Sequence, residues 1–202
     1  MSEYALVIDT SSMTGLCALA QRSSAAAGWN VLTEQYVDAE LSHSEILFMS
    51  IQEVLDKNKI KFSDLNMVVY CAGPGSFTGL RISYSAVKAF SLAKGIKAIG
   101  VSSLRALMYN LKDAKEKYRV VTIKGSGNDT FAFIEDAEHK VILAEGSYDK
   151  AHVQEVITGL GKEVACIERG KVTALGMLSL LEDHAIDGIN YLKASYAEKG
   201  RS

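Results

Sequence analysis

The sequence predicts an α/β protein in which one order of elements, βββαβα, occurs twice. Apolar runs rich in β-branched residues alternate with runs of helical periodicity. A glycine-rich turn at 73–81 joins an expected strand to an expected helix. The order read along the first half then recurs along the second. This recurrence predicts two lobes, an N-terminal lobe at 1–103 and a more divergent C-terminal lobe at 104–202.

The first half contains the more regular pattern. Its expected strands lie at 4–8, 16–20, 29–37, 67–72 and 96–101, and its expected helices at 43–58 and 78–94. The second helix follows the glycine turn and is stopped by Gly95, as helices commonly are. A short helix at 104–111 leads into the second half.

The second half repeats the order with weaker signals. Strands are expected at 119–123, 130–135, 141–145 and 164–168, with helices beginning at His152 and Lys171. Pattern alone leaves other α+β arrangements open, because fold class does not follow from element order by itself.

The glycine turn admits two interpretations. Its spacing is not GxGxxG, and the chain has no Asp or Glu between Asp64 and Asp113, so a dinucleotide-binding motif is excluded. One alternative is a phosphate cradle made of backbone N–H groups. The other is a tight turn whose glycines let two backbone segments meet.

Composition is that of a compact soluble protein. The 202 residues are 48% hydrophobic with a net charge of −2, which excludes a globally basic nucleic-acid binder. The acid-free stretch 65–112 nevertheless carries six cations: Arg81, Lys88, Lys94, Lys97, Arg105 and Lys112. Such a segment either faces an anionic partner or is a solvated surface.

Cellular location is predicted from the cysteines and from the apolar runs. The three cysteines are widely spaced and lie in apolar runs, as reduced buried thiols do. We find no export signal or membrane-length apolar run. We therefore expect a cytoplasmic protein that does not contact a membrane.

No catalytic or metal-binding set is visible. The four histidines are scattered along the sequence and do not form a metal-ligand pattern. Ser42 and Glu45 match a capping box, which gives these two residues a structural role. The segment Asp9-Thr10-Ser11 follows the first strand, where hydroxyls bind phosphate in some proteins and simply stabilise turns in others. We predict no catalytic residue and no metal ligand in this chain.

Several motifs together resemble a known family. They are 5–11 (ALVIDTS), 42–47 (SHSEIL), 73–81 (GPGSFTGLR) and 101–104 (VSSL), with a fainter match at 190–193 (NYLK). The chain is similar to the bacterial TsaB (YeaZ-like) proteins of tRNA threonylcarbamoyladenosine biosynthesis. The resemblance is specific over roughly 5–105 and faint beyond.

The resemblance implies a fold and a role. The fold is the duplicated actin-like (ASKHA, ribonuclease H-like) architecture with a cleft between lobes. The role is a non-catalytic scaffold that pairs with a TsaD-like paralogue and works with a TsaE-like ATPase, reaching tRNA indirectly through the complex. ATP and metal would belong to those partner subunits, and no cofactor is expected on this chain.

The resemblance also implies sites. The partner is expected to pair with the helices at 43–58 and 78–94 in a four-helix bundle, through the following residues: Leu47, Met49, Ile51, Val54, Gly79, Ser83, Ala86 and Phe90. The other reading is that both helices bury these faces in their own lobe. A candidate nucleotide or anion cleft comprises Asp9, Thr10, Ser11, Gly73, Gly75 and Lys124.

Lys124 departs from the family pattern, which usually has an aspartate there. An acid at this place helps position metal and water in actin-like ATPases, so Lys124 argues against ordinary metal-dependent ATP hydrolysis. It also offers an ion pair to Asp9 across the cleft.

Three alternative functions remain open at this stage. Two are enzymes of the same fold, a glycoprotease-like peptidase and a small-molecule kinase. The third is a homodimer that uses the same helices and takes no part in tRNA modification.

Overall fold

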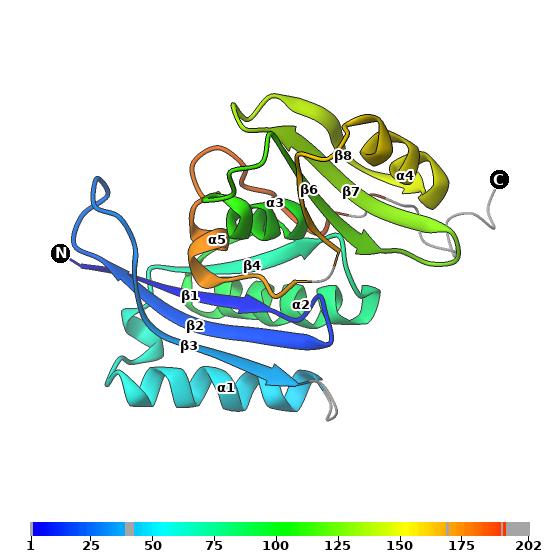
Figure 1. The fold of residues 1–202 in the computed structure, drawn as a ribbon. Helices are drawn as coiled ribbons and strands as arrows, with labels where there is room; N and C mark the ends of the chain where they lie inside the picture. The colour runs from blue at the N-terminus through cyan, green and yellow to red at the C-terminus, as the bar shows by residue number, and fades with distance from the viewer. Residues whose placement is uncertain (1, 39–42, 169, 191, 193–202) are drawn as a thin grey trace.

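The computed structural model describes residues 2–38, 43–168, 170–190 and 192. It contains two mixed β-sheets with helices on the outer faces and between them (Figure 1). Because Ser42 lies outside the described residues, the predicted capping box does too. The prediction of a mixed α/β fold with a duplicated order is confirmed.

The first sheet has the strand order β3-β2-β1-β4-β5. Its strands are β1 (Glu3–Asp9), β2 (Thr14–Arg22), β3 (Asn30–Asp38), β4 (Met67–Gly73) and β5 (Lys97–Ser102). The first three strands are antiparallel neighbours, whereas β4 and β5 run parallel to β1. β1 and β4 are buried along most or all of their length, so they read as continuous apolar runs.

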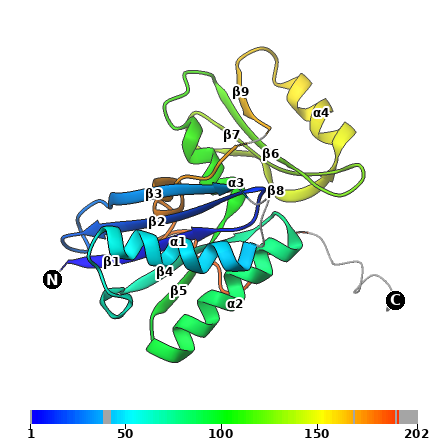
Figure 2. The same ribbon diagram turned by 90° about the horizontal axis from the view of Figure 1, so that it is seen from below.

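Helices α1 (His43–Lys57) and α2 (Phe77–Lys94) lie side by side on one face of this sheet (Figure 2). α2 begins at the N-cap Ser76, whose side chain accepts a hydrogen bond from the Gly79 N–H, and ends at Gly95 with a left-handed φ of 67°. A 3-10 turn, η1 (Phe62–Asp64), precedes β4.

The second sheet repeats the first in its strand order, β8-β7-β6-β9. Its elements are β6 (Tyr118–Lys124), β7 (Asp129–Asp136), β8 (Val141–Asp149), α4 (Lys150–Gly159) and β9 (Val164–Ile167). β8 is four residues longer than the expected strand 141–145. α4 starts two residues before His152, because the Asp149 side chain caps it by accepting from the Ala151 N–H.

Two short helices and a 3-10 turn fill the space between the sheets. They are α3 (Ser103–Met108), η2 (Tyr109–Leu111) and α5 (Ala174–Leu178). α5 begins at Ala174, three residues after the expected start at Lys171, because the Thr173 side chain caps it by accepting from the Gly176 N–H.

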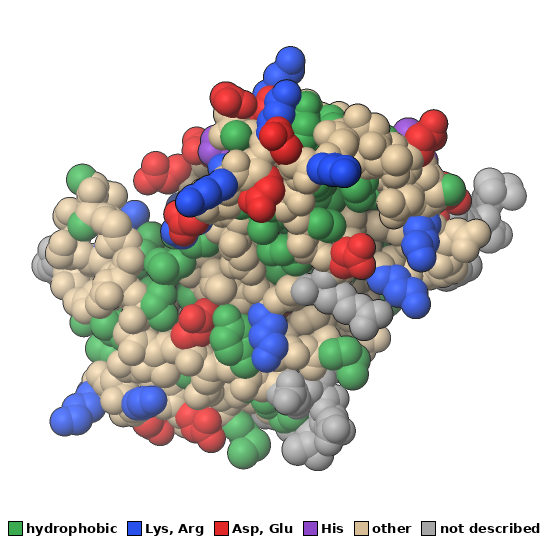
Figure 3. Space-filling model, viewed as in Figure 1, with side chains coloured by type: hydrophobic (Ala, Val, Ile, Leu, Met, Phe, Trp, Pro, Cys, Tyr) green, Lys and Arg blue, Asp and Glu red, His purple; other side chains and the backbone are tan. Residues whose placement is uncertain are grey.

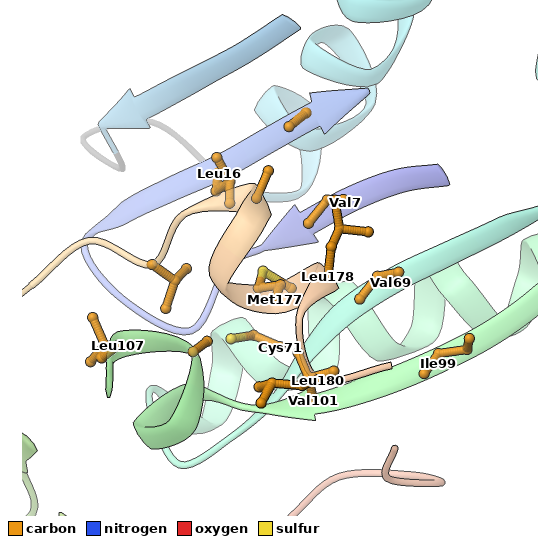
Figure 4. Packing of buried hydrophobic residues seen from close by; sticks show 14 of the residues in the cluster. Val7, Leu16, Val69, Cys71, Ile99, Val101, Leu107, Met177, Leu178 and Leu180 are labelled. Atoms are coloured by element: carbon orange, nitrogen blue, oxygen red, sulfur yellow. The ribbon is translucent and has the colours of Figure 1, made fainter. Parts of the chain in front are cut away.

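One hydrophobic core joins the two lobes. Val7 and Val69 of the first sheet, Met177 of α5, and Val121 and Phe133 of the second sheet belong to the same buried cluster. Figure 4 shows part of this packing around α5. The predicted boundary near residue 103 therefore separates the strands of the two sheets but not their core.

The chain also returns from α5 to the first lobe. Ile186 forms an antiparallel bridge to Gly100 of β5, and the Asn190 N–H donates to the Ala72 carbonyl at 2.7 Å. Ile186 and Asn190, late in the chain, therefore contact the first lobe.

Candidate functional site

The β1–β2 turn packs directly on the start of α2. The Thr10 hydroxyl donates to the Gly79 carbonyl at 2.7 Å, and the Ser76 N–H donates to the Ser11 carbonyl at 2.7 Å. Thr10 and Ser11 are both buried. Their polar groups stabilise the meeting of two segments that are far apart in the sequence.

The glycines of the 73–81 turn permit this contact. A Cβ at Gly75 would lie 2.6 Å from the Ser11 carbonyl oxygen, and one at Gly79 would overlap the Thr10 carbonyl oxygen. Gly73 has a φ of 116° and lies against the Asn190 backbone. Backbone packing thus explains the three glycines, as the second interpretation of the turn predicted. The nucleotide or anion cleft stays a prediction.

Asp9 and Lys124 occupy different environments. Asp9 is buried at the end of β1, where its Oδ1 accepts from the Ser11 N–H at 2.7 Å. Burial, with the Asp9 charge as a second cause, raises the pKa of the neighbouring Cys71 thiol well above its ordinary value. Lys124 is exposed at the end of β6. Among the salt bridges of the described residues, none joins Lys124 to Asp9.

The outer face of α1 and α2 exposes large apolar side chains. Phe48 is 52% exposed, Met49 64%, Phe77 42% and Leu92 87%. Four of the nine exposed large hydrophobic residues that the structure describes therefore lie on these two helices. We call these four residues the α1–α2 apolar face. Large exposed apolar patches on protein surfaces often mark interaction sites.

A groove runs between the two helices beside these residues. Its volume is about 560 Å³, and its lining is mostly apolar: Phe48, Phe77, Thr78, Arg81, Ile82, Ser85, Ala86 and Ala89. The Arg81 guanidinium lies 3.9 Å from the centroid of the Phe77 ring. Small residues such as Ser85 and Ala89 leave room for a helix to approach closely.

Six of the eight residues predicted for the interface are instead buried within this chain. They are Leu47, Ile51, Val54, Gly79, Ser83 and Ala86. The stripe through Leu47, Ile51 and Val54 follows the helical repeat that faces the sheet, and it belongs to the core beneath α1. These six residues therefore pack within their own lobe in the structure.

The other two residues predicted for the interface, Met49 and Phe90, are not fully buried. Met49 is exposed, as an interface residue must be, whereas Phe90 is partly buried. The Phe90 ring packs edge-on against Phe48 at 6.0 Å and against Phe62 at 4.8 Å. Sequence periodicity could have identified the residues on the outward sides of the two helices. Phe48 and Met49 fall between the core positions of α1, and Arg81, Ser85 and Ala89 recur every four residues along α2.

A polar clamp that the sequence did not indicate connects the lobes. The Glu145 carboxylate of β8 accepts from the Ser102 hydroxyl and from the Arg105 Nε. Ser102 is also the N-cap of α3, and Arg105 lies over the Phe133 ring at 4.6 Å. The Ser102-Ser103 motif thus joins β5 to the second sheet.

The described residues contain no group of three or more His, Cys, Asp or Glu side chains that could hold a metal ion. Over the same part of the chain, none of the helices has the length and hydropathy needed to cross a membrane.

A family model matches residues 37–164, more than half of the chain: TsaD, tRNA N6-adenosine threonylcarbamoyltransferase. The chain belongs to this family and is TsaB-like (YeaZ-like).

Two relatives place the chain within the family. The tRNA threonylcarbamoyladenosine biosynthesis protein TsaB of Buchnera aphidicola subsp. Schizaphis graminum is 34% identical over 107 residues, 53% of this chain and 48% of the relative. The tRNA N6-adenosine threonylcarbamoyltransferase of Lactobacillus acidophilus is 30% identical over 161 residues, 74% of this chain and 46% of the relative. The chain thus spans about half the length of these curated relatives.

A solved structure shares the fold over nearly the whole chain. The crystal structure of an uncharacterized protein with similarity to peptidase YEAZ, from Pseudomonas aeruginosa, superposes with a TM-score of 0.73 at 16% identity. The superposition covers 95% of this chain and all of that chain. The predicted TsaB (YeaZ-like) recognition and fold class are therefore confirmed.

Proposed function

We propose that this chain is a non-catalytic, cytoplasmic scaffold subunit of the machinery that makes threonylcarbamoyladenosine in tRNA. It pairs with a TsaD-like transferase through the outer face of α1 and α2 and supports that enzyme together with a TsaE-like ATPase. The names of the relatives support the pathway. The uncovered apolar face of α1 and α2 carries the proposal of pairing.

The chemistry of this face favours a helical partner. Phe48 and Phe77 flank the groove, and the small residues Ser85 and Ala89 lie in it. A partner helix laid in such a groove removes aromatic surface from water, which is a main source of stability in helix-in-groove complexes.

The turn site supports the non-catalytic part of the proposal. In a chain that bound nucleotide phosphates at the β1–β2 turn, the turn would present its hydroxyls and N–H groups to the ligand. Here Thr10 and Ser11 are engaged with the start of α2. We expect no cofactor on this chain, with ATP and metal held by the partners.

Mixing experiments test the pairing. Met49→Glu and Ser85→Arg each place a charge on the exposed face without touching the core, so the fold should remain intact while the partner is lost. Ser83→Arg is unsuitable, because Ser83 is completely buried and its replacement would unfold the helix packing. Size-exclusion chromatography with a purified TsaD-like protein should show co-elution of the wild type and separate elution of both variants.

The matched control is Lys140→Glu, a charge change on the second lobe that should leave co-elution unchanged. If Met49→Glu and Ser85→Arg are folded and still co-elute, α1 and α2 do not form the contact. If the wild type elutes only as a homodimer and ignores the TsaD-like protein, the homodimer alternative replaces this proposal. Proteolysis or small-molecule phosphorylation by the pure chain would favour the enzyme alternatives.

A further inference from the structure

Five exposed lysines gather at the end of the first lobe where α1 and α2 finish. They are Lys57, Lys59, Lys61, Lys94 and Lys97, which we call the lysine rim. The topology brings them together, because α1 leads into β4 and α2 leads into β5, and the starts of these parallel strands are neighbours. Met67 at the start of β4 pairs in register with Lys97 at the start of β5.

A ring contact joins the two halves of the rim. Phe62, next to Lys61, packs on Phe90 of α2 with ring centroids 4.8 Å apart. Phe90 lies one helical turn before Lys94, so this contact brings Lys61, the N-cap of η1, toward the end of α2. Figure 3 shows Lys and Arg side chains at the same corner of the molecule, over the end of α1.

The rim's two segments, 56–64 and 94–97, contain five lysines and two acids, Asp56 and Asp64. The salt bridges of the described residues include none of the five lysines. Asp64 accepts from the Lys61 backbone N–H and Asp56 from the Gln52 amide. In a chain whose net charge is −2, this end of the first lobe therefore holds a local excess of positive charge.

Helix-end electrostatics explains only part of this excess. Lys57 and Lys94 lie in the last turns of their helices, where cations offset the helix dipole. Lys59, Lys61 and Lys97 lie outside both helices and have no such role. Helix-end electrostatics therefore does not account for these three lysines.

Lys59 occupies a position that ordinarily favours glycine. Its φ is 58°, and the Lys59 N–H donates to the Asp56 carbonyl while the Ile60 N–H donates to the Leu55 carbonyl, which forms a Schellman motif. A lysine in this left-handed conformation is less stable than glycine. The backbone therefore does not explain the choice of a cation.

The duplicated architecture offers an internal comparison. The end of the second sheet where the parallel strands β6 and β9 start carries Lys115, Lys117 and Lys162 interspersed with Glu116 and Glu163. The hydrogen bond to Tyr118 is the main cause that raises the pKa of Lys117, and the charges of Glu163 and Glu138 add smaller contributions. The second lobe thus balances its lysines with acids, and the lysine rim is not a general property of this architecture.

We propose that the lysine rim binds the phosphate backbone of tRNA directly. This inference rests on the proposed function, and it adds a contact between this subunit and the RNA to the indirect route through the complex. Exposed lysines separated across two elements suit a phosphate backbone, which needs positive charges along a path and no base-specific geometry. The contact would be strongly dependent on salt, because it releases counterions.

The test is fluorescence anisotropy with the full chain and a labelled, unmodified transcript of a tRNA that has adenosine beside its anticodon. The rim variant carries Lys59→Gln, Lys61→Gln and Lys97→Gln, and the matched control carries Lys115→Gln, Lys117→Gln and Lys162→Gln. Both variants lose three positive charges. We expect the rim variant to bind at least about tenfold more weakly, and its log–log salt slope to fall by about two. The control should stay within about twofold of the wild type.

Lys59→Gly separates charge from fold. It removes one cation while giving the Schellman position its preferred residue, so thermal stability should hold or rise while RNA affinity falls. Equal weakening by the rim and control variants would show a net-charge effect and overturn the proposal. So would a wild type that binds vesicles of phosphatidylserine and phosphatidylcholine but not tRNA, or one that binds neither. Co-elution of the rim variant with the TsaD-like protein reports on the proposed function separately.

Discussion

Gly79 of α2 lies against the carbonyl oxygen of Thr10 so closely that no side chain fits between them. The Thr10 hydroxyl donates to the Gly79 carbonyl in the same contact. These two residues, 69 positions apart, fix the β1–β2 turn to the first turn of α2. The face of α2 that we assign to the partner is therefore held in place from the sheet.

Gly79→Ala should destabilise the protein severely, by about 3 kcal/mol or more, because the new methyl group must displace backbone rather than a flexible side chain. Urea unfolding followed by circular dichroism measures the loss. Gly159→Ala is the control: this glycine ends α4, and a Cβ there meets nothing within 4 Å. It should be neutral or slightly stabilising. Equal effects of the two substitutions would show that the Thr10 contact is loose.

Removing the Glu145 carboxylate should weaken the joint between the lobes. Glu145→Gln leaves Arg105 without its charged partner, at a cost of about 2 kcal/mol, because hydrogen bonds to charged groups contribute about that much. Hydrogen exchange should speed up at α3 and at β8 together. Asp113→Asn removes the exposed partner of Lys112 and should change nothing measurable. Unchanged protection at α3 in Glu145→Gln would mean that the clamp is not a structural joint.

The three cysteines should differ in thiol reactivity. Burial raises the pKa of Cys17 to about 12 and that of Cys71 well above its ordinary value, and both thiols are inaccessible. Cys166 is exposed on β9. A thiol reagent at pH 8 should modify one cysteine per native chain, slowly because burial also raises the pKa of Cys166, and three in denaturant. Peptide mass spectrometry should find the label on Cys166, and native labelling of Cys71 would contradict the packing of β4.

The Tyr70 hydroxyl should make the protein sensitive to alkali. It donates to the Gly188 carbonyl at 2.9 Å and accepts from the Gly188 N–H at 3.2 Å, and burial raises the pKa of Tyr70 to about 12. The unfolded chain ionises near 10, so the Tyr70 contribution is complete below pH 10 and is lost as pH rises toward 12. The stability of Tyr70→Phe should be lower than that of the wild type at neutral pH and should decline less steeply above pH 10. Parallel pH profiles of the two proteins would contradict this assignment.

The order of elements could be predicted from the sequence because each strand and helix shows its apolar periodicity within its own residues. Three features could not. Ser83 lies on the small-residue face of α2, yet it is completely buried in its own lobe, which helical spacing alone does not show. The Glu145 clamp joins residues 40 or more positions apart, and the return of Ile186 to Gly100 makes a sheet contact from a segment with no strand pattern. Such contacts depend on how the lobes meet, which periodicity does not encode.

The most direct test of the central claim is a reconstituted tRNA modification reaction in which nucleoside mass spectrometry measures threonylcarbamoyladenosine. The reaction contains the TsaD-like and TsaE-like proteins, the enzyme that supplies the threonylcarbamoyl donor, ATP, magnesium and unmodified tRNA. Product should form with the wild-type chain, fall to background when the chain is omitted, and be lost with Met49→Glu but not with Lys140→Glu. The account is contradicted if this chain alone modifies tRNA, or if the other proteins are equally active without it.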